Sequence, residues 1–423
     1  MTDMPLPTSV PGLNVFLNEE HVGTVHDTTP LSFTYAATWL AKRDAIAIAT
    51  LPLISQPQTT RAVQAFFENL LPEGELRDYL VSQRHASSLF SLLRTTAGDT
   101  AGAFVLLPAD ARPAEPSYTP TTWEELARTL KKTSGAAIDI NGEDTRISLA
   151  GAQDKASIAI FSDGIVRLPQ NTAPSTHILK PSIRRLHKVW DSAVNETIIM
   201  LTAANCGLPT AEVFYEPTTN ACVVKRFDRV EHEPGKLDRL IQYDLCQLAG
   251  VLSDRKYESE GGPGIEQCAS LIADYSDQPA ADLRHFAQWI LFNLYVGNND
   301  SHAKNLSIYH TPDRGLILTP FYDLMCTRIY PGLARKFALA IGGETQPGKI
   351  SQEHITMMAG QLGMQPKFLI RMAADLAVRI PSAVQDALGA LHPTLAPKSK
   401  VLAERLGQFV VSTTNKIAAR IAS

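Results

Sequence analysis

The chain has 423 residues, of which 44% are hydrophobic, and its formal net charge is -4. This length is sufficient for a large core divided among two or three subdomains. The charge shows none of the basic surplus that general nucleic-acid binding requires. The five cysteines are scattered and include no Cys-x-x-Cys pair, so neither a zinc site nor a disulfide framework is indicated.

Two features favour a cytoplasmic protein that does not enter a membrane. The first residues lack the positive region and the apolar run of a signal peptide. The longest apolar stretch, 286–296, is interrupted by Gln288 and Asn293 and is too short to span a bilayer. We interpret this stretch as a buried helix and expect a cytoplasmic location.

The first 110 residues have the pattern of a separate subdomain, in which strands come before helices. Alternating apolar residues predict the strands, and apolar residues near helical spacing, such as Val63, Phe66 and Leu70, predict the helices. The predicted strands are 13–17, 21–26, 31–35 and 103–107, and the predicted helices are 61–71, 76–84 and 88–93.

A linker that holds several prolines is expected at 109–120. Thr121 or Thr122 then caps a helix, with Glu124 or Glu125 as the second member of a capping box. Strands follow, interrupted by one helix at 188–206. The predicted strands of this region are 146–149, 156–161, 176–180, 211–216 and 221–227.

From residue 237 onward the sequence is largely helical, except around 305–341, where short strands are expected at 306–309 and 316–318. Strands followed by helices, with carboxylates just after the change, are typical of a kinase. We therefore predict an α+β chain with a two-lobed protein-kinase-like fold. Its parts are an N-terminal subdomain (1–110), a β-rich N-terminal lobe (121–230) and a mostly helical C-terminal lobe (231–423).

The most informative motif is Asp300, followed five residues later by Asn305 and downstream by Asp323. In kinases one Asp accepts the proton of the attacking hydroxyl, while such an Asn and a second Asp hold magnesium against the nucleotide phosphates. His302 and Lys304 are neighbouring candidates for phosphate contact. Asp and Asn are also common in turns, so the motif gains weight only with the residues upstream.

Lys180 ends an otherwise apolar strand and needs a partner once it is buried. Nucleotide phosphates are one candidate partner and Glu196 is another, because a strand Lys paired with a Glu of the next helix is the alignment device of kinases. Glu196 lies off the apolar stripe of its predicted helix, which consists of Trp190, Val194, Ile198 and Leu201.

Three further segments are less specific. Small residues in 148–155 let backbone N–H groups approach phosphate oxygens, and Lys155 adds charge. The strand and polar turn at 223–229 fit a hinge that holds an adenine ring, although an ordinary edge strand has the same pattern. The glycines and proline of 257–264 indicate a sharply shaped loop, to which the sequence alone assigns no role.

In combination these segments resemble the HipA toxin family, the serine/threonine kinases of type II toxin–antitoxin modules. The resemblance also includes the N-terminal strands and Asn-Leu-Leu-Pro at 69–72, so it covers nearly the full length. The motifs that carry it are Ile-Ser-Leu-Ala-Gly-Ala-Gln-Asp-Lys at 147–155, Arg-Phe-Asp-Arg at 226–229, Lys-Tyr-Glu-Ser-Glu-Gly-Gly-Pro-Gly at 256–264 and Asp-Ser-His-Ala-Lys-Asn at 300–305.

The resemblance implies a role for each matching position. Asp300 is implied to be the catalytic base, Asn305 and Asp323 to bind Mg²⁺, and Ser148 to be autophosphorylated with loss of activity. A phosphate group at Ser148 would repel the phosphates of ATP. The residues implied to bind ATP are Ala150, Gly151, Ala152, Gln153, Asp154, Lys155, Lys180, Lys225, Arg226, Phe227, Gln242, His302, Ala303, Lys304, Asn305, Tyr322 and Asp323.

The resemblance also implies partners. It implies a non-specific serine/threonine protein kinase whose substrate is a translation-related protein, with glutamyl-tRNA synthetase as the family's best-known target, and a HipB-like helix-turn-helix antitoxin. Two departures matter: Lys225 replaces an acidic hinge residue, and 342–349 is less basic than the family's DNA-contacting loop. We therefore expect operator DNA to be bound mainly through the antitoxin.

Two other functions stay open. One is a catalytically weak co-repressor that acts with a DNA-binding antitoxin, and the presence of Lys180, Asp300, Asn305 and Asp323 weighs against it. The other is a small-molecule kinase similar to the antibiotic phosphotransferases. Those enzymes usually carry His-Gly-Asp where this chain has Asn-Asn-Asp at 298–300, and the separate N-terminal block fits a protein partner better.

Overall fold

The computed structural model describes residues 11–96, 98–132, 153–184, 186–233 and 235–423. These residues form two compact units, each built from several stretches of the chain. Unit 1 takes its described residues from 11–122, 153–177 and 228–255, and unit 2 from 123–132, 178–227 and 256–423. The three-part division expected from the sequence stays a prediction.

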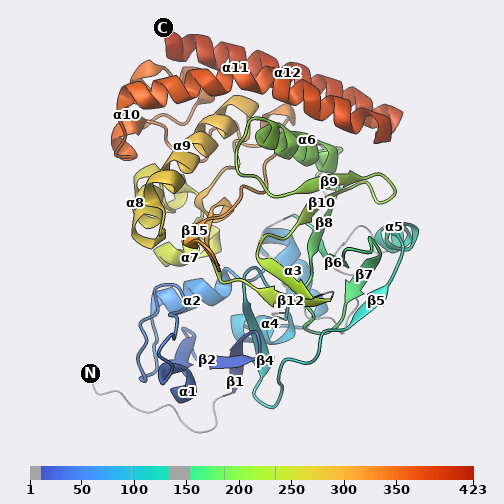
Figure 1. Cartoon of the computed structure of the whole chain (residues 1–423), viewed down its shortest axis with the longest axis vertical. Coiled ribbons are helices and arrows are strands. Elements are labelled where there is room, and N and C mark those ends of the chain that lie inside the picture. The colour runs from blue at the N-terminus through green and yellow to red at the C-terminus, as the bar shows by residue number, and fades with distance from the viewer. Residues whose placement is uncertain (1–10, 97, 133–152, 185, 234) are drawn as a thin grey trace. The chain divides into compact units, whose positions relative to one another are not determined.

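Unit 1 begins with an antiparallel sheet in the order β3-β2-β1-β4. Helix α2 packs Val63, Phe66 and Phe67 into the core, and the Thr60 side chain accepts a hydrogen bond from the backbone N–H of Val63 to cap the helix. The elements are β1 (Gly12–Leu17), β2 (Glu20–His26), β3 (Ser32–Tyr35), α1 (Ala37–Leu40), α2 (Arg61–Glu68), α3 (Gly74–Gln83), α4 (Leu89–Thr96) and β4 (Phe104–Pro108), coloured blue to cyan in Figure 1. The predicted strands and helices of this region are confirmed, with shifts of a few residues at their ends.

The rest of unit 1 contains strands that the sequence pattern did not predict. The expected linker includes β5 (Tyr118–Pro120), and the region after 237, expected to be largely helical, instead begins with strands. Strands β11 and β12 are rich in charged, mostly exposed residues, and β5 and β13 have only three residues each, so these strands lack the apolar alternation that marks a half-buried strand. The remaining elements are β6 (Ala156–Ile160), β7 (Val166–Pro169), β11 (Arg229–Glu233), β12 (Lys236–Arg239), β13 (Gln242–Asp244) and α7 (Leu245–Ala249).

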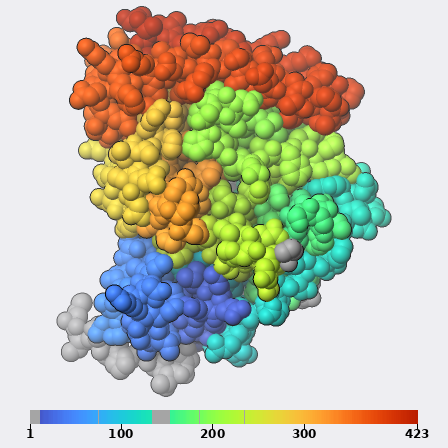
Figure 2. Space-filling view, in the orientation of Figure 1, coloured from blue at the N-terminus to red at the C-terminus, as the bar shows by residue number. Residues whose placement is uncertain are grey.

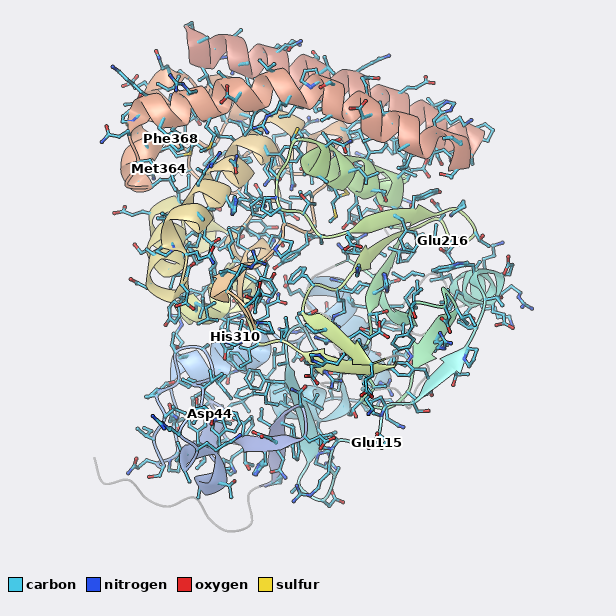
Figure 3. All side chains as sticks on the ribbon, viewed as in Figure 1. Asp44, Glu115, Glu216, His310, Met364 and Phe368 are labelled. Atoms are coloured by element: carbon cyan, nitrogen blue, oxygen red, sulfur yellow. The ribbon has the colours of Figure 1, made fainter. Side chains whose placement is uncertain are left out.

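Unit 2 contains three neighbouring strands, β8 (His177–Pro181, whose first residue lies in unit 1), β10 (Ala221–Lys225) and β9 (Val213–Glu216), against which α6 (Ser192–Asn205) packs. Figure 3 labels Glu216 at the end of β9. Helix α6 starts four residues later than predicted, after Asp191 in the left-handed region. The predicted apolar stripe was therefore wrong: Trp190 precedes the helix, and α6 is buried on nearly every side.

Most of unit 2 is helical, as predicted. Helix α9 is the expected buried helix and ends at Gly297, whose φ of 77° is the left-handed conformation of a helix C-cap. Figure 2 shows α11 and α12 side by side as one band of the surface, and Figure 3 labels Met364 and Phe368 where α11 begins. The elements are α5 (Trp123–Lys132), α8 (Ile265–Tyr275), α9 (Pro279–Val296), β14 (Ser307–Thr311), β15 (Gly315–Leu318), α10 (Gln352–Gln361), α11 (Pro366–Leu391) and α12 (Pro397–Ala422).

Among the described residues, no helix combines the length and the apolar character needed to cross a membrane.

Candidate active site

Lys180 lies at the centre of a charged cluster in unit 2. Its Nζ is 2.5 Å from Oε1 of Glu196 on α6 and 2.5 Å from Oδ1 of Asp323. The side chains of Lys180 and Glu196 are 7% and 1% exposed, whereas that of Asp323 is 42% exposed. The structure therefore confirms the predicted Lys180–Glu196 pair and adds Asp323 as a second carboxylate.

The two carboxylates keep Lys180 charged. Burial by itself lowers the pKa of a lysine, but the negative charges of Asp323 and Glu196 outweigh burial here and raise the pKa of Lys180 above its ordinary value. A permanently charged ammonium group held beside an open carboxylate is suited to binding an anionic group such as phosphate.

Asp323 is held in an uncommon backbone conformation. Its φ is 59°, in the left-handed region, which Asp tolerates better than most residues do. The segment that follows is fixed by Asn195 of α6, whose side-chain amide donates to the carbonyl of Cys326 at 3.0 Å and accepts from its N–H at 2.9 Å. Two adjacent residues of α6, Asn195 and Glu196, thus position Lys180 and the chain after Asp323.

The loop after α9 presents Asp300. Asn298 is buried, its side-chain amide donates to Oδ1 of Asn293, and its own Oδ1 accepts from the backbone N–H of Asp300 at 3.2 Å. The side-chain amide of Asn305 donates to the backbone carbonyl of Asp300 at 3.1 Å. Asp300 itself is exposed although its neighbours are buried, so this braced loop presents one carboxylate to solvent.

Asn305 and Asp323 have the chemistry of a magnesium site. Since the Asn305 amide nitrogen bonds the backbone of Asp300, its carbonyl oxygen is the atom suited to a hard cation, and Asp323 supplies a carboxylate. In the described parts of the chain, no three His, Cys, Asp or Glu residues gather as a metal site. Magnesium bound by these two residues therefore needs phosphate oxygens and water as further ligands.

The other predicted residues of unit 2 lie in three settings: a cluster of aromatic rings, an exposed ion pair and the buried interior. The ring of Phe227 packs against Tyr309 and Tyr322, with centroids 5.5 and 5.7 Å apart, and the hydroxyl of Tyr322 bonds the hydroxyl of Ser307 at 2.8 Å. Lys225 is exposed and pairs with Glu212 at 3.0 Å. The other predicted residues of this unit are buried, and they are Arg226, His302, Ala303 and Lys304.

Some predicted residues lie elsewhere. Lys155, Asp154 and Gln153 precede β6, and Gln242 begins β13, so all four belong to unit 1. The predicted autophosphorylation site Ser148 and the loop residues Ala150 to Ala152 lie outside the described residues.

Sequence reasoning missed Tyr257. Its hydroxyl donates a hydrogen bond of 2.6 Å to Oδ1 of Asp300, and its ring meets that of His302 edge to face, with centroids 5.1 Å apart. Tyr257 and Asp300 are 43 positions apart in the sequence, so no local spacing reveals their contact. The glycine-rich sequence just after Tyr257 was the available signal that this loop has a specific shape.

Comparison with known families finds two matches in this chain. Residues 13–107 match the HipA N-terminal domain and residues 147–384 match the HipA-like C-terminal domain. Together the two matches include every residue of the candidate site described above.

Known proteins agree with these matches. The chain is 35% identical over 371 residues to Y4mE of Sinorhizobium fredii, provisionally named as a kinase, covering 85% of this chain and 87% of that protein. It is 31% identical to the serine/threonine-protein kinase toxin HipA of Shewanella oneidensis, covering 81% of each. A solved complex of Shewanella oneidensis HipA, HipB and operator DNA matches with a TM-score of 0.78 at 28% identity, covering 96% of both chains. The predicted α+β, kinase-like fold class is thereby confirmed.

Proposed function

Because the chain belongs to the HipA family, we propose that it is an ATP-dependent, non-specific serine/threonine protein kinase and the toxin of a toxin–antitoxin pair. The observation that carries this proposal is the position of Lys180 between Glu196 and Asp323. An isolated structural salt bridge needs no second, exposed carboxylate, whereas phosphoryl transfer needs both the paired lysine and the metal-binding Asp.

In the proposed reaction, Asp300 accepts the proton of a serine or threonine hydroxyl as that oxygen attacks the γ-phosphate of ATP, and the bond from the γ-phosphorus to its bridging oxygen breaks to release ADP. Lys180, fixed by Glu196, holds the nucleotide phosphates. Asn305 and Asp323 hold the metal, and bound Mg²⁺ neutralises negative charge on the phosphates. The exposure of Asp300 allows a folded protein to bring its hydroxyl to this carboxylate.

The family match supports finer assignments. We propose that Ser148 is the site of inactivating autophosphorylation and that the substrate is a translation-related protein such as glutamyl-tRNA synthetase. We propose a HipB-like antitoxin as partner, with operator DNA bound mainly through it, because the matched complex contains HipB and operator DNA. With these roles we propose a cytoplasmic location.

The matched complex also supports a second candidate, a kinase-fold co-repressor with little catalytic activity. The test that separates the two is phosphate incorporation from labelled ATP and Mg²⁺, with peptide mapping, for the wild type and Asp300→Asn. Removing a general base typically lowers a rate by about 10²–10⁴-fold, so we expect at least a hundredfold loss. Asp274→Asn, a change of an exposed carboxylate at the end of α8, is the matched control and should equal the wild type.

Equal rates for the wild type and Asp300→Asn would refute the proposed base. An unphosphorylated wild type that labels neither itself nor a cell lysate, yet retains operator DNA together with the antitoxin, would establish the co-repressor.

A further inference from the structure

Tyr257 contacts the functional end of Asp300. The phenol hydroxyl donates to Oδ1 of that carboxylate at 2.6 Å, a short distance typical of a hydrogen bond to a charged oxygen. The tyrosine ring meets that of His302 edge to face, and Nζ of Lys256 is 5.4 Å from the tyrosine ring centroid. These two neighbours restrict the rotation of the ring.

Asp300 needs such a contact more than a buried residue does. The asparagines of the catalytic loop bond its backbone: Asn298 accepts from its N–H and Asn305 donates to its carbonyl. Neither bond sets the side-chain rotamer of an exposed aspartate. The Tyr257 hydroxyl bonds the carboxylate itself, and a carboxylate has about four lone-pair positions. A substrate hydroxyl can therefore bind the same group while Tyr257 stays in place.

The loop that carries Tyr257 is built for one conformation. The carbonyl of Tyr257 accepts from the backbone N–H groups of Glu260 and Gly262, both at 2.9 Å. Gly261 has a φ of 92°, which favours glycine. These bonds close a tight turn directly after Tyr257, so the start of the loop is fixed by its own backbone.

Glu258 anchors the same loop from its other side. Its Oε2 accepts from the backbone N–H of Ala340 at 2.6 Å. A Cβ atom at Gly264 would lie 2.6 Å from Oε1 of Glu258 and displace that carboxylate. The glycine-rich sequence after Tyr257 thus has two physical causes, the backbone turn at Gly261 and the close approach of Glu258 to Gly264.

We propose that Tyr257, held by this anchored loop, is a positioning residue that orients the carboxylate of Asp300 to accept the proton of the substrate hydroxyl. The inference rests on the proposed kinase function and adds to it a residue from a segment to which the sequence assigns no role. Misplacing a reacting group by a small distance is costly in catalysis, so orientation of an exposed loop carboxylate is a plain reason for the loop to be rigid.

An alternative interpretation of the contact is that the Tyr257 hydroxyl occupies the place of the substrate hydroxyl and inhibits the enzyme. The two interpretations predict opposite changes in rate when the bond is lost. Loss of a positioning bond lowers the rate at saturating ATP, whereas loss of an inhibitory bond raises it. For a positioning residue, Mg-ATP affinity stays unchanged in Tyr257→Phe, because the lost hydroxyl bonds the carboxylate of the proposed base and the phenylalanine ring can keep the contact with His302.

The test compares Tyr257→Phe with the wild type in two measurements: the rate of phosphate incorporation at saturating Mg-ATP, and Mg-ATP affinity by calorimetry. We expect about a tenfold lower rate, the scale of one hydrogen bond to a charged group, and an affinity within twofold. Glu258→Ala should lower the rate in the same way but by less, and Glu258→Gln, which keeps an acceptor for Ala340, should restore most of it.

Two controls isolate the contact. Tyr275→Phe removes a hydroxyl at the end of α8, and Glu260→Gln changes an exposed carboxylate of the same loop; both should match the wild type. An unchanged or faster Tyr257→Phe enzyme, or a parallel loss of ATP affinity, overturns the positioning role. An unphosphorylated wild type that incorporates no phosphate instead refutes the proposed kinase function itself, so the two failures are distinguishable.

Discussion

Two buried cations, one in each unit, have the same kinds of partner but different surroundings. In unit 1 the guanidinium of Arg229 bonds Asp99 and Asp228 at 2.9 Å each, and also the backbone carbonyls of Gly102 and Thr100. In unit 2 Lys180 bonds Glu196 and Asp323 at 2.5 Å. By the distances between their nitrogen and oxygen atoms alone, both clusters are close ion pairs of the same kind.

Exposure separates the two clusters. The side chains of Arg229, Asp99 and Asp228 are 2%, 0% and 5% exposed, and each carboxylate also accepts from the fold itself: Asp99 from Ser175, and Asp228 from the N–H of Gly102. In the Lys180 cluster one carboxylate, Asp323, is 42% exposed. The closed cluster holds segments of unit 1 together, whereas the open one leaves a carboxylate accessible to solvent and to a ligand.

The largest expected effect comes from breaking the closed cluster. Arg229→Met removes the cation that bonds the buried carboxylates of Asp99 and Asp228, and the next cation, Arg239, lies 3.7 Å from Asp99. Removing one partner of a buried ion pair costs about 3–5 kcal/mol. We expect the free energy of unfolding, measured by urea denaturation, to fall by that amount. Arg112→Met, at an exposed position of the same unit, should leave it unchanged. A stable Arg229→Met protein would remove the distinction between the clusters.

Opening the second cluster further should affect catalysis and spare the fold. Asp323→Asn removes a charge from the proposed metal-binding position, and loss of one preorganised electrostatic contact typically lowers a rate by about 10²–10³-fold. Stability should change by less than about 1 kcal/mol, because Asp323 is partly exposed and Lys180 keeps Glu196. Phosphate incorporation and urea denaturation of one preparation test both expectations. A large loss of stability with normal activity would assign Asp323 to the scaffold.

The sequence predicted the parts of the site that have local signatures. Asp300 and Asn305 are five residues apart on one loop, and the structure joins them through the Asn305 amide. The Lys180–Glu196 pair also followed from the order of strand and helix. Asp323 as a partner of Lys180 did not, because 143 residues separate the two and a left-handed backbone at a single Asp leaves no pattern. Tyr257 was missed for the same reason.

The motif at 226–229 shows another limit of sequence reasoning. The hinge interpretation covers the strand and turn at 223–229, with Lys225, Arg226 and Phe227 as the residues implied to bind ATP. These three belong to unit 2, whereas Asp228 and Arg229 belong to unit 1. Phe227 packs on Tyr309 and Tyr322 in unit 2, whereas Asp228 and Arg229 form the closed cluster of unit 1. The sequence of a short motif does not distinguish residues of a functional site from residues that stabilise the fold. The burial and the partners of each residue make that distinction.

The smallest expected effect comes from a third ion pair. It tests whether burial, rather than the distance between the charged groups, determines how much an ion pair contributes to stability. Arg167 bonds both carboxylate oxygens of Asp163, at 2.9 and 2.5 Å, but Asp163 is exposed. The hydrogen bond from Arg167 lowers the pKa of Asp163 to about 2. A lowered pKa stabilises the fold above the ordinary pKa of Asp, about 3.9, and this contribution is lost as the pH falls toward 2.

For Asp163→Asn we therefore expect a urea midpoint near that of the wild type at pH 7, and any remaining difference should shrink as the pH falls from 4 to 2. Water screens this exposed pair despite its short, bidentate geometry. The matched comparison is Arg229→Met under the same conditions, where bonds of similar length lie in the interior. Equal losses of stability in both variants would show that bond geometry outweighs burial in this chain. The exposure of Asp323 would then no longer distinguish the Lys180 cluster of the proposed active site from the Arg229 cluster.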